Sequence, residues 1–418
     1  MPSEKAITCG WFSGQQKEVE IAASLAELQA LCRTAGAETV GQVWQKRPVP
    51  DRRFLIGLGK VEEIKLLLAS SGANLVVFFN VLNTMQQRNL EDFLGVKVID
   101  RSRLILDIFA RRARSQEGKL QVELAQLLYF LPRLTGKGIA LSRLGGGIGT
   151  RGPGESKLET DRRLIKVKIA RIRQKLKVVT KNRDLQRQNR RHLPVPLVSL
   201  VGYTSAGKST LFNALTGEDA FVSNKLFSTL DPLLRRVDLQ DVHPGYYYIL
   251  SDTVGFIRSM PEELFISFKA TLEEVRQADI VLHVIDLTNP DWPGQKSEVE
   301  KVLHQLDVGP DKVITVFNKI DILADRENLL ALKNPGEVHV SAVAQSGIGA
   351  LQEEIFKRYF SDYEFCTIEV ADEQQLDALS NWAIVLEKNR VVGGFQAGVL
   401  CSREKMLQFK EKHGGVIR

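Results

Sequence analysis

The order of apolar and polar positions divides the chain into segments of different periodicity. In residues 1–100, short apolar runs alternate with amphipathic stretches. The runs expected to form strands are Ala6–Phe12, Thr39–Trp44, Asn74–Phe79 and Val96–Ile99. The helical patterns between them are Glu18–Cys32, Val61–Ala69 and Thr84–Phe93. Alternation of this kind is typical of a largely parallel sheet, so residues 1–100 predict an N-terminal α/β domain.

From residue 101 to 194 the pattern becomes heptad-like. Apolar residues recur at alternating steps of four and three through Leu120, Leu124, Leu127, Leu131 and Leu134. After a break the repeat continues through Leu158, Ile165, Ile169, Ile172, Leu176 and Val179. Two helices packed along a narrow apolar seam, most simply an antiparallel hairpin, explain this spacing. The glycine-rich segment 144–155 between them is expected to form a loop and no helix.

Strand patterns return after His192–Pro196, a proline-containing segment that marks a domain boundary. Each apolar run in residues 195–362 is followed by a polar segment; the runs are Leu197–Val201, Tyr246–Leu250, Val313–Phe317 and Val338–Val340. In residues 363–418 two strands, Glu364–Val370 and Ala397–Cys401, are expected to flank a helix at Gln374–Lys388. The predicted fold class is therefore α/β, with four parts: residues 1–100, the hairpin 101–194, a larger α/β domain 195–362 and a small α/β domain 363–418.

Composition narrows the class of protein. The chain has 418 residues, too many for one ordinary core, with 44% hydrophobic and 26% charged residues, as in soluble globular proteins. It lacks a run of about 18 apolar residues, and its first residues do not form a secretory pattern. Four scattered cysteines and six unclustered histidines indicate neither a disulfide framework nor a zinc site. We expect a cytoplasmic monomer.

The net charge of +7 is concentrated in the second helix of the hairpin. Its basic residues are Arg162, Arg163, Lys166, Lys168, Arg171, Arg173, Lys175, Lys177, Lys181, Arg183, Arg187, Arg190 and Arg191. Acidic residues that could pair with them at i,i+4 are nearly absent beyond Asp161 and Asp184. Unbalanced positive charge beside a glycine-rich tip predicts contact with nucleic-acid phosphates, with Arg162 and Arg163 as candidates. Aromatic stacking platforms are missing, which favours recognition of shape and charge.

The segment after the first strand of the 195–362 domain carries a phosphate-binding pattern. Glycines allow a tight loop whose N–H groups point at phosphates, and the following helix adds its N-terminus. Lys208 would reach the β- and γ-phosphates, and the Ser209 hydroxyl would bind Mg²⁺. The residues predicted to bind nucleotide here are Gly202, Tyr203, Thr204, Ser205, Ala206, Gly207, Lys208, Ser209 and Thr210.

Three further elements follow in the order that a GTPase requires. Asp252 is placed to hold Mg²⁺, and the Gly255 N–H can meet the γ-phosphate. The carboxylate of Asp321 can accept two hydrogen bonds from guanine, for which adenine has no matching donors. The remaining predicted contacts come from Thr253 and Val254, from Asn318 and Lys319, and from Ser341 and Ala342. Residues 195–362 therefore predict a magnesium-dependent GTPase domain that binds GTP and GDP.

The segment Phe227–Pro232 is the candidate switch. Thr229 is the residue expected to complete the Mg²⁺ site and to sense the γ-phosphate, with Phe227 and Ser228 beside it. The predicted metal ligands are thus Ser209, Thr229 and Asp252. The predicted catalytic residues are Lys208, Thr229 and Gly255.

Four motifs together resemble the HflX family of ribosome-associated, translation-factor-related GTPases. They are Gly145–Asp161, Gly202–Thr210, Phe227–Pro232 and Asp252–Ile257. The resemblance implies binding to the large ribosomal subunit near the subunit interface and separation of subunits in stress. It also implies that the tip 145–154 faces ribosomal RNA near the peptidyl-transferase centre. The candidate contacts at that tip are Gly147, Arg151 and Gly152.

Two positions bear on the rate of hydrolysis. Phe256 stands where many GTPases have a water-positioning glutamine, so intrinsic hydrolysis should be slow. The family shares this hydrophobic residue, and the resemblance therefore implies that another group or the ribosome completes the site. Many relatives have asparagine at the position of Ser205, where it supports K⁺, so stimulation by K⁺ stays open here. Arg235 and Arg236 are weak candidates for an arginine finger.

Two other functions remain open. One is an ATP-using RNA remodeller with a second nucleotide site in the N-terminal domain, where Gly57–Lys60 is a fragment of a glycine loop. A plain turn is the simpler interpretation of that fragment. The other is a regulatory switch that acts on a protein, for which neutralising the basic helix should have little effect.

Overall fold

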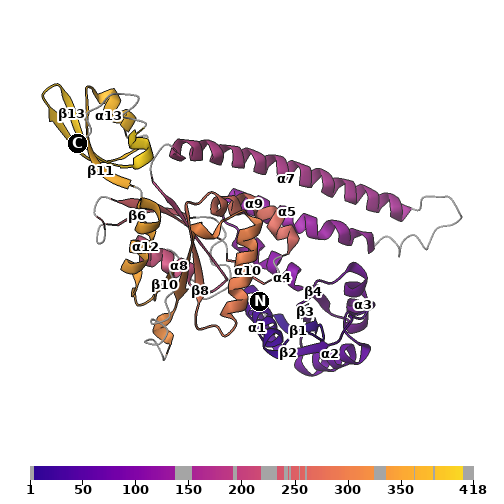
Figure 1. The fold of residues 1–418 in the computed structure, drawn as a ribbon. Helices are drawn as coiled ribbons and strands as arrows, with labels where there is room; N and C mark the ends of the chain where they lie inside the picture. The colour runs from indigo at the N-terminus through magenta and orange to yellow at the C-terminus, as the bar shows by residue number, and fades with distance from the viewer. Residues whose placement is uncertain are drawn as a thin grey trace. The chain divides into compact units, whose positions relative to one another are not determined.

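The structure is a computed structural model. It describes residues 4–136, 153–191, 195–217, 233–239, 243, 246–253, 255–258, 261–323, 336–361, 363–379 and 382–407. The chain divides into two compact units, of which the first contains residues 1–177 and 258–269 and the second most of the remainder (Figure 1). Each unit is described by itself. None of the helices in these ranges is long and apolar enough to cross a membrane.

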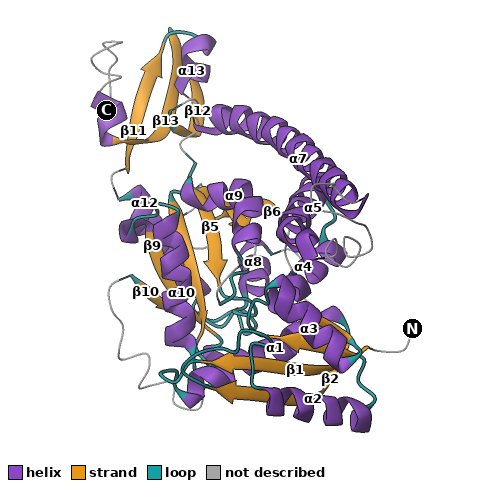
Figure 2. Cartoon of the chain, turned by 90° about the vertical axis from the view of Figure 1, so that its right-hand side faces the viewer, coloured by secondary structure: helices purple, strands orange, loops and turns teal. Residues whose placement is uncertain are grey.

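The first unit contains a four-stranded parallel sheet. Its strands are β1 (Glu4–Phe12), β2 (Ala37–Lys46), β3 (Leu75–Phe78) and β4 (Lys97–Asp100). They lie in the order β2-β1-β3-β4, and each neighbouring pair is parallel. The helices between them are α1 (Glu18–Ala35), α2 (Leu58–Ser71) and α3 (Thr84–Leu94) (Figure 2). The predicted N-terminal α/β arrangement is confirmed, and Gly57 proves to be the N-cap of α2.

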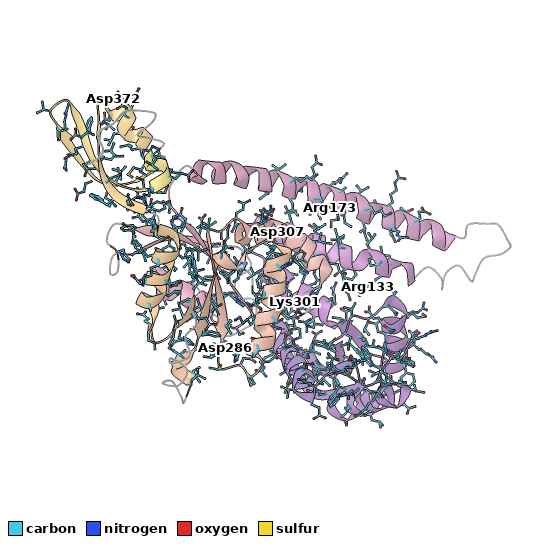
Figure 3. All side chains as sticks on the ribbon, in the orientation of Figure 1. Arg133, Arg173, Asp286, Lys301, Asp307 and Asp372 are labelled. Carbon is cyan, nitrogen blue, oxygen red and sulfur yellow. The ribbon has the colours of Figure 1, made fainter. Side chains whose placement is uncertain are left out.

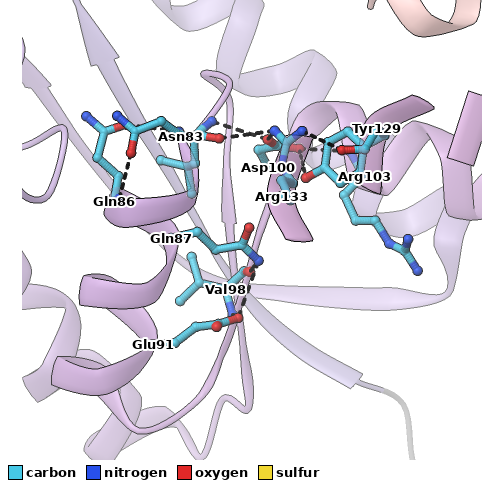
Figure 4. A network of polar contacts seen from close by, with 10 residues as sticks. Asn83, Gln86, Gln87, Glu91, Val98, Asp100, Arg103, Tyr129 and Arg133 are labelled. Carbon is cyan, nitrogen blue, oxygen red and sulfur yellow. Dashed lines mark hydrogen bonds and ion pairs between the residues drawn. The ribbon is translucent and has the colours of Figure 1, made fainter. Parts of the chain in front are cut away.

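A buried carboxylate joins this sheet to the base of the hairpin. Asp100 ends β4 and is 1% exposed. It accepts hydrogen bonds from the hydroxyl of Tyr129 (3.0 Å), from Arg133 Nη2 (3.1 Å) and from the backbone N–H groups of Leu82 and Arg103 (Figure 4). A buried charge with this many donors is compensated, so the contact fixes the segment after β4 against the sheet.

The hairpin consists of α5 (Gln116–Phe130) and the 39-residue α7 (Pro153–Arg191). It is preceded by α4 (Arg101–Arg112), a helix that the repeat did not predict. The predicted apolar seam is confirmed: Leu124, Ile169 and Ile172 form its buried centre. Leu134, expected in the first helix, lies instead in the 3₁₀ helix η1 (Leu131–Gly136), because Pro132 lacks the N–H that would continue α5.

The second helix begins earlier than expected. Residues 153–155, assigned to the loop from the sequence, belong to the first turn of α7. This part of the prediction was wrong because proline is well suited to the first helical position, where its missing N–H is not needed. Residues 137–152, which include the predicted tip, lie outside the described residues.

The second unit is built on a six-stranded sheet in the order β10-β9-β8-β5-β7-β6. The strands are β5 (Leu197–Gly202), β6 (Leu233–Asp238), β7 (Tyr247–Asp252), β8 (Ile280–Asp286), β9 (Val313–Asn318) and β10 (Glu337–His339). All neighbours are parallel except the pair β6–β7. The helices are α8 (Lys208–Thr216), α10 (Trp292–Gln305) and α12 (Ile348–Phe360), with 3₁₀ turns η2 (Pro310–Lys312) and η3 (Ile320–Ile322). Of α9 (Glu262–Arg276), residues 270–276 belong to this unit and residues 262–269 to the first.

The C-terminal part is a small antiparallel sheet. Its strands β11 (Tyr363–Val370), β12 (Ile384–Val391) and β13 (Gly394–Ser402) lie in the order β11-β13-β12, with α13 (Glu373–Leu379) after β11. The helix predicted over Gln374–Lys388 is therefore wrong in its second half. Residues 384–391 form a strand because they pair with β13 over most of its length. Cys366 and Cys401 are buried here with their sulfurs 3.6 Å apart.

Candidate nucleotide-binding site

The predicted motifs meet at one edge of the second sheet. The phosphate loop follows β5, Asp252 ends β7, Asn318 ends β9, and Ser341 lies just after β10. These strands are parallel, so their carboxyl ends lie at the same edge. A crevice at the carboxyl ends of parallel strands is the usual place for a ligand in such sheets. The topology thus assembles segments that are far apart in the sequence.

The phosphate loop is shaped by two close approaches. Gly202 has φ +152°, and a Cβ there would lie 2.2 Å from the carbonyl oxygen of Val284 on β8. Gly207 has φ +91°, and its Cβ would lie 2.3 Å from Nδ2 of Asn318. Side chains therefore cannot be placed at either position without moving the loop. Ser205 also adopts a left-handed conformation, with φ +65°.

Lys208 is oriented by the loop itself. Its ammonium donates to the carbonyl oxygens of Gly202 (3.0 Å) and Tyr203 (2.9 Å), and the residue is 7% exposed. Burial lowers the pKa of Lys208 to about 8, while the charge of Asp252 acts in the opposite direction. The lysine is thus buried and fixed at the first turn of α8, where bound phosphates would favour its charged form.

Two of the three predicted metal ligands lie together. The hydroxyl of Ser209 donates to Oδ2 of Asp252 over 3.1 Å, and Asp252 is 1% exposed. A hydroxyl and a carboxylate in contact are oxygen donors of the kind that Mg²⁺ prefers. The third predicted ligand, Thr229, lies outside the described residues, as do Phe227, Ser228 and Val254.

The segment after Asp252 packs directly on the phosphate loop. The N–H of Thr204 donates to the carbonyl of Phe256 (2.8 Å), and the N–H of Phe256 donates to the carbonyl of Gly202 (3.0 Å). A Cβ on Gly255 would lie 3.0 Å from Nζ of Lys208, so the predicted γ-phosphate sensor is next to the lysine. The ring of Phe256 is buried, at 1% exposure, and offers no hydrogen bond to water.

Asn318 connects the phosphate loop with the base-recognition loops. Its Nδ2 donates to the carbonyl of Ala206 (2.9 Å), and its Oδ1 accepts from the N–H of Ala342 (3.1 Å). Asp321, the predicted guanine-selective carboxylate, accepts from the hydroxyl of Ser341 over 2.6 Å. The side chain of Asn318 is 1% exposed, so both of its bonds are protected from water.

The other candidates have different environments. Arg236 is held on the surface of β6 by Asp238, with its Nη2 2.6 Å from Oδ1, and stacks 3.8 Å from the ring of Tyr247. Arg236 is thus paired along β6, and a role for it as an arginine finger stays a prediction. Arg162 and Arg163 are exposed on α7, whereas Gly147, Arg151 and Gly152 lie outside the described residues. Asp286, which contacts Lys319, was missed because the apolar run of β8 was not recognised.

A phosphate loop, a guanine-selective loop and a magnesium-type carboxylate at the edge of one parallel sheet define a phosphate-loop GTPase. Three family models match the chain in order: "GTP-binding GTPase N-terminal" at residues 22–110, "GTP-binding GTPase Middle Region" at residues 112–190, and "50S ribosome-binding GTPase" at residues 197–319. The chain belongs to the HflX family of GTPases, as its relatives also show.

Those relatives align over most of the chain. The GTPase HflX of Caldanaerobacter subterraneus subsp. tengcongensis is 50% identical over 361 residues, which are 86% of this chain and 82% of the relative. The GTPase HflX of Escherichia coli (strain K12) is 44% identical over 358 residues, with 85% and 83% covered. The sequence-based recognition of this family is confirmed, and so is the assignment of GTP hydrolysis.

Proposed function

We propose that this GTPase, in its GTP-bound state, binds the large ribosomal subunit and splits or rescues stalled ribosomes under stress. The observation that carries the proposal is the exposed positive charge of α7. The exposed basic side chains in its described part are Arg162, Arg163, Lys166, Lys168, Arg171, Arg173, Lys175 and Lys177. Figure 3 labels Arg173 near the middle of the helix. A stripe of this kind suits phosphates of ribosomal RNA, because each contact releases counterions.

Two further observations support an RNA target. Within residues 159–179 the ion pair between Lys168 and Glu123 (2.6 Å) neutralises only one of these charges, and Glu159 and Asp161 are the acidic residues in the same stretch. The matching family model is described as a 50S ribosome-binding GTPase. We propose that the tip 145–154 of the hairpin, with Gly147, Arg151 and Gly152, contacts the ribosomal RNA.

We also propose roles for the nucleotide site. Lys208 would hold the β- and γ-phosphates, and the N–H of Gly255 would meet the γ-phosphate. Ser209, Asp252 and Thr229 would hold Mg²⁺, which would neutralise developing charge on the phosphates. Because Phe256 cannot orient water, intrinsic turnover would be slow and docking on the ribosome would complete the site. The protein would act as a cytoplasmic monomer.

The test is GTP hydrolysis with and without large ribosomal subunits, together with co-sedimentation. Several-fold stimulation and GTP-dependent pelleting are expected, and both should be lost when residues 145–154 are deleted. The charge-reversal pair Arg171→Glu and Arg173→Glu should weaken pelleting and lower its salt dependence. A matched control reverses two exposed charges elsewhere, Lys388→Glu and Arg390→Glu on β12, and should pellet normally.

The alternatives predict other results. A switch that acts on a protein would hydrolyse GTP without stimulation by ribosomes and would tolerate the α7 reversals. An ATP-using remodeller would bind ATP even after Asp321→Asn. The first result would overturn the ribosome proposal while leaving GTP binding intact, and the second would establish a separate ATP site that the ribosome proposal does not include.

A further inference from the structure

Asp286 stands at the end of β8, beside the guanine-recognition loop. In the parallel register of β8 and β9 it lies opposite Asn318, the residue before Lys319. Figure 3 labels Asp286 in the second unit. Oδ2 of Asp286 accepts a hydrogen bond from Nζ of Lys319 over 2.6 Å. Oδ1 accepts from the N–H (3.0 Å) and the hydroxyl (2.6 Å) of Thr288. One oxygen thus fixes a turn, and the other holds the lysine.

Lys319 needs such a partner. Its backbone is left-handed, with φ +65°, and its side chain is 29% exposed. A lysine has four rotatable side-chain bonds and loses much rotamer entropy when it is held in one place. The carboxylate of Asp286 is only 14% exposed, so the ion pair is less screened than one on an open surface. The ion pair holds the lysine side chain in one arrangement, which lowers the side-chain entropy that binding of a base would otherwise remove.

We propose that Asp286 is a positioning residue for the guanine base. By fixing the ammonium of Lys319, it holds the four-carbon stem of that lysine as an apolar wall beside the base, and it does not touch the nucleotide itself. The inference concerns nucleotide binding and stands whether or not the ribosome is the partner. A base contact is the same in the ground state and the transition state, so Asp286 should affect KM and leave kcat unchanged.

The variant that isolates this role is Asp286→Asn. It keeps the size of the side chain and an oxygen acceptor for Thr288, and it removes the charge that attracts Lys319. The affinities for a fluorescent GDP and a fluorescent GTP analogue should both fall by about 2- to 5-fold, the upper part of the range measured for ion pairs that are not fully buried. Dissociation should be faster to the same degree, KM should rise, and kcat should stay within about 2-fold.

The matched control is Thr288→Val, which removes the other side-chain bond to Asp286. It keeps the ion pair with Lys319 and the backbone bond to Oδ1. If Asp286 served only the turn, this variant would weaken binding as much as Asp286→Asn does. We expect it to bind both nucleotides within about 2-fold of the parent, with any change confined to the melting temperature.

A double-mutant cycle with Lys319→Met decides the mechanism. Methionine keeps an apolar stem without a charge, so Asp286→Asn should have no further effect on affinity in this background. The proposal is overturned if the two losses add fully, if kcat falls while KM is unchanged, or if Asp286→Asn binds as tightly as the parent. If the parent protein did not bind guanine nucleotides at all, the GTPase assignment itself would be contradicted. Failure of the Asp286 proposal and failure of the GTPase assignment are therefore distinguishable.

Discussion

The asparagine that joins the two halves of the nucleotide site offers the sharpest test of the structure. Replacing Asn318 with alanine removes the donor to Ala206 and the acceptor for Ala342. Replacing it with aspartate keeps the acceptor but faces the carbonyl of Ala206 with a buried carboxylate. Because Asn318 is 1% exposed, the groups left behind have little access to water. The aspartate variant should therefore be harmful even though it has the same shape.

The magnitude follows from the two lost bonds. A buried polar group left without a partner costs about 1–3 kcal/mol, so the two groups exposed by Asn318→Ala should cost about 2–6 kcal/mol of loop organisation. If this cost falls on the binding-competent arrangement, nucleotide affinity drops by about 30-fold or more. GDP and GTP should be affected equally, since neither bond of Asn318 involves Gly255, the residue proposed to sense the γ-phosphate.

The assay is equilibrium titration with fluorescent GDP and GTP analogues, paired with thermal unfolding without nucleotide. Asn80→Ala is the matched control, because Asn80 makes two comparable bonds, to the N–H and the carbonyl of Trp11, in the first unit. It should lower stability and leave nucleotide affinity unchanged. The reasoning is refuted if Asn318→Asp binds within 2-fold of the parent, or if only GTP binding is weakened.

Three further predictions concern titratable groups. Burial lowers the pKa of Lys208 to about 8 and bound phosphates would raise it, so binding of GDP near pH 8.5 should take up protons, and affinity should fall as pH rises above this pKa. Calorimetry in buffers of different ionisation enthalpy measures this uptake. Burial lowers the pKa of His283 to about 3, so the stability that its neutral form contributes is complete above about pH 6.5 and is lost as pH falls toward 3. When the pH is lowered from 7.5 to 5.5, the free energy of unfolding measured in urea should therefore fall less for His283→Gln than for the parent. All four cysteines are buried, and burial raises the pKa of the Cys9 and Cys32 thiols, so a thiol reagent at pH 8 should label none in the native protein and four after unfolding. Rapid labelling of the native protein would contradict this packing.

Local signals explain why much of the fold was predictable. In the first unit the strands are short apolar runs, and α3 begins with a capping box in which Asn83 and Gln86 bond each other's backbone. Such patterns depend only on residues that are close together in the sequence. The four motifs of the nucleotide site are equally local, since each follows a strand. The sequence therefore placed β1, β5, β7 and β9 within a few residues of their observed bounds.

The misses depend on contacts between distant segments. Residues 384–391 contain good helix formers, but their backbone N–H and C=O groups pair with those of β13, so the segment forms a strand. The role of Asp286 depends on the register of β8 against β9, which no local pattern reveals. The two bonds of Asn318 likewise appear only when the loops after β5 and β10 are brought together. Local patterns predicted the nucleotide-binding motifs, and tertiary contacts decide how the residues of these motifs support one another.

The bonds of Asn318 also have a consequence for the order in which the protein matures during synthesis. They reach a residue 112 positions earlier and another 24 positions later in the chain. The first sheet, by contrast, is complete once residue 100 has been made. A growing chain can fold that sheet early, whereas the two bonds of Asn318 that support the phosphate loop cannot both form until the segment around Ala342 has emerged. Guanine nucleotide would then stabilise, by mass action, only chains in which this segment is available, and leave shorter nascent chains unaffected.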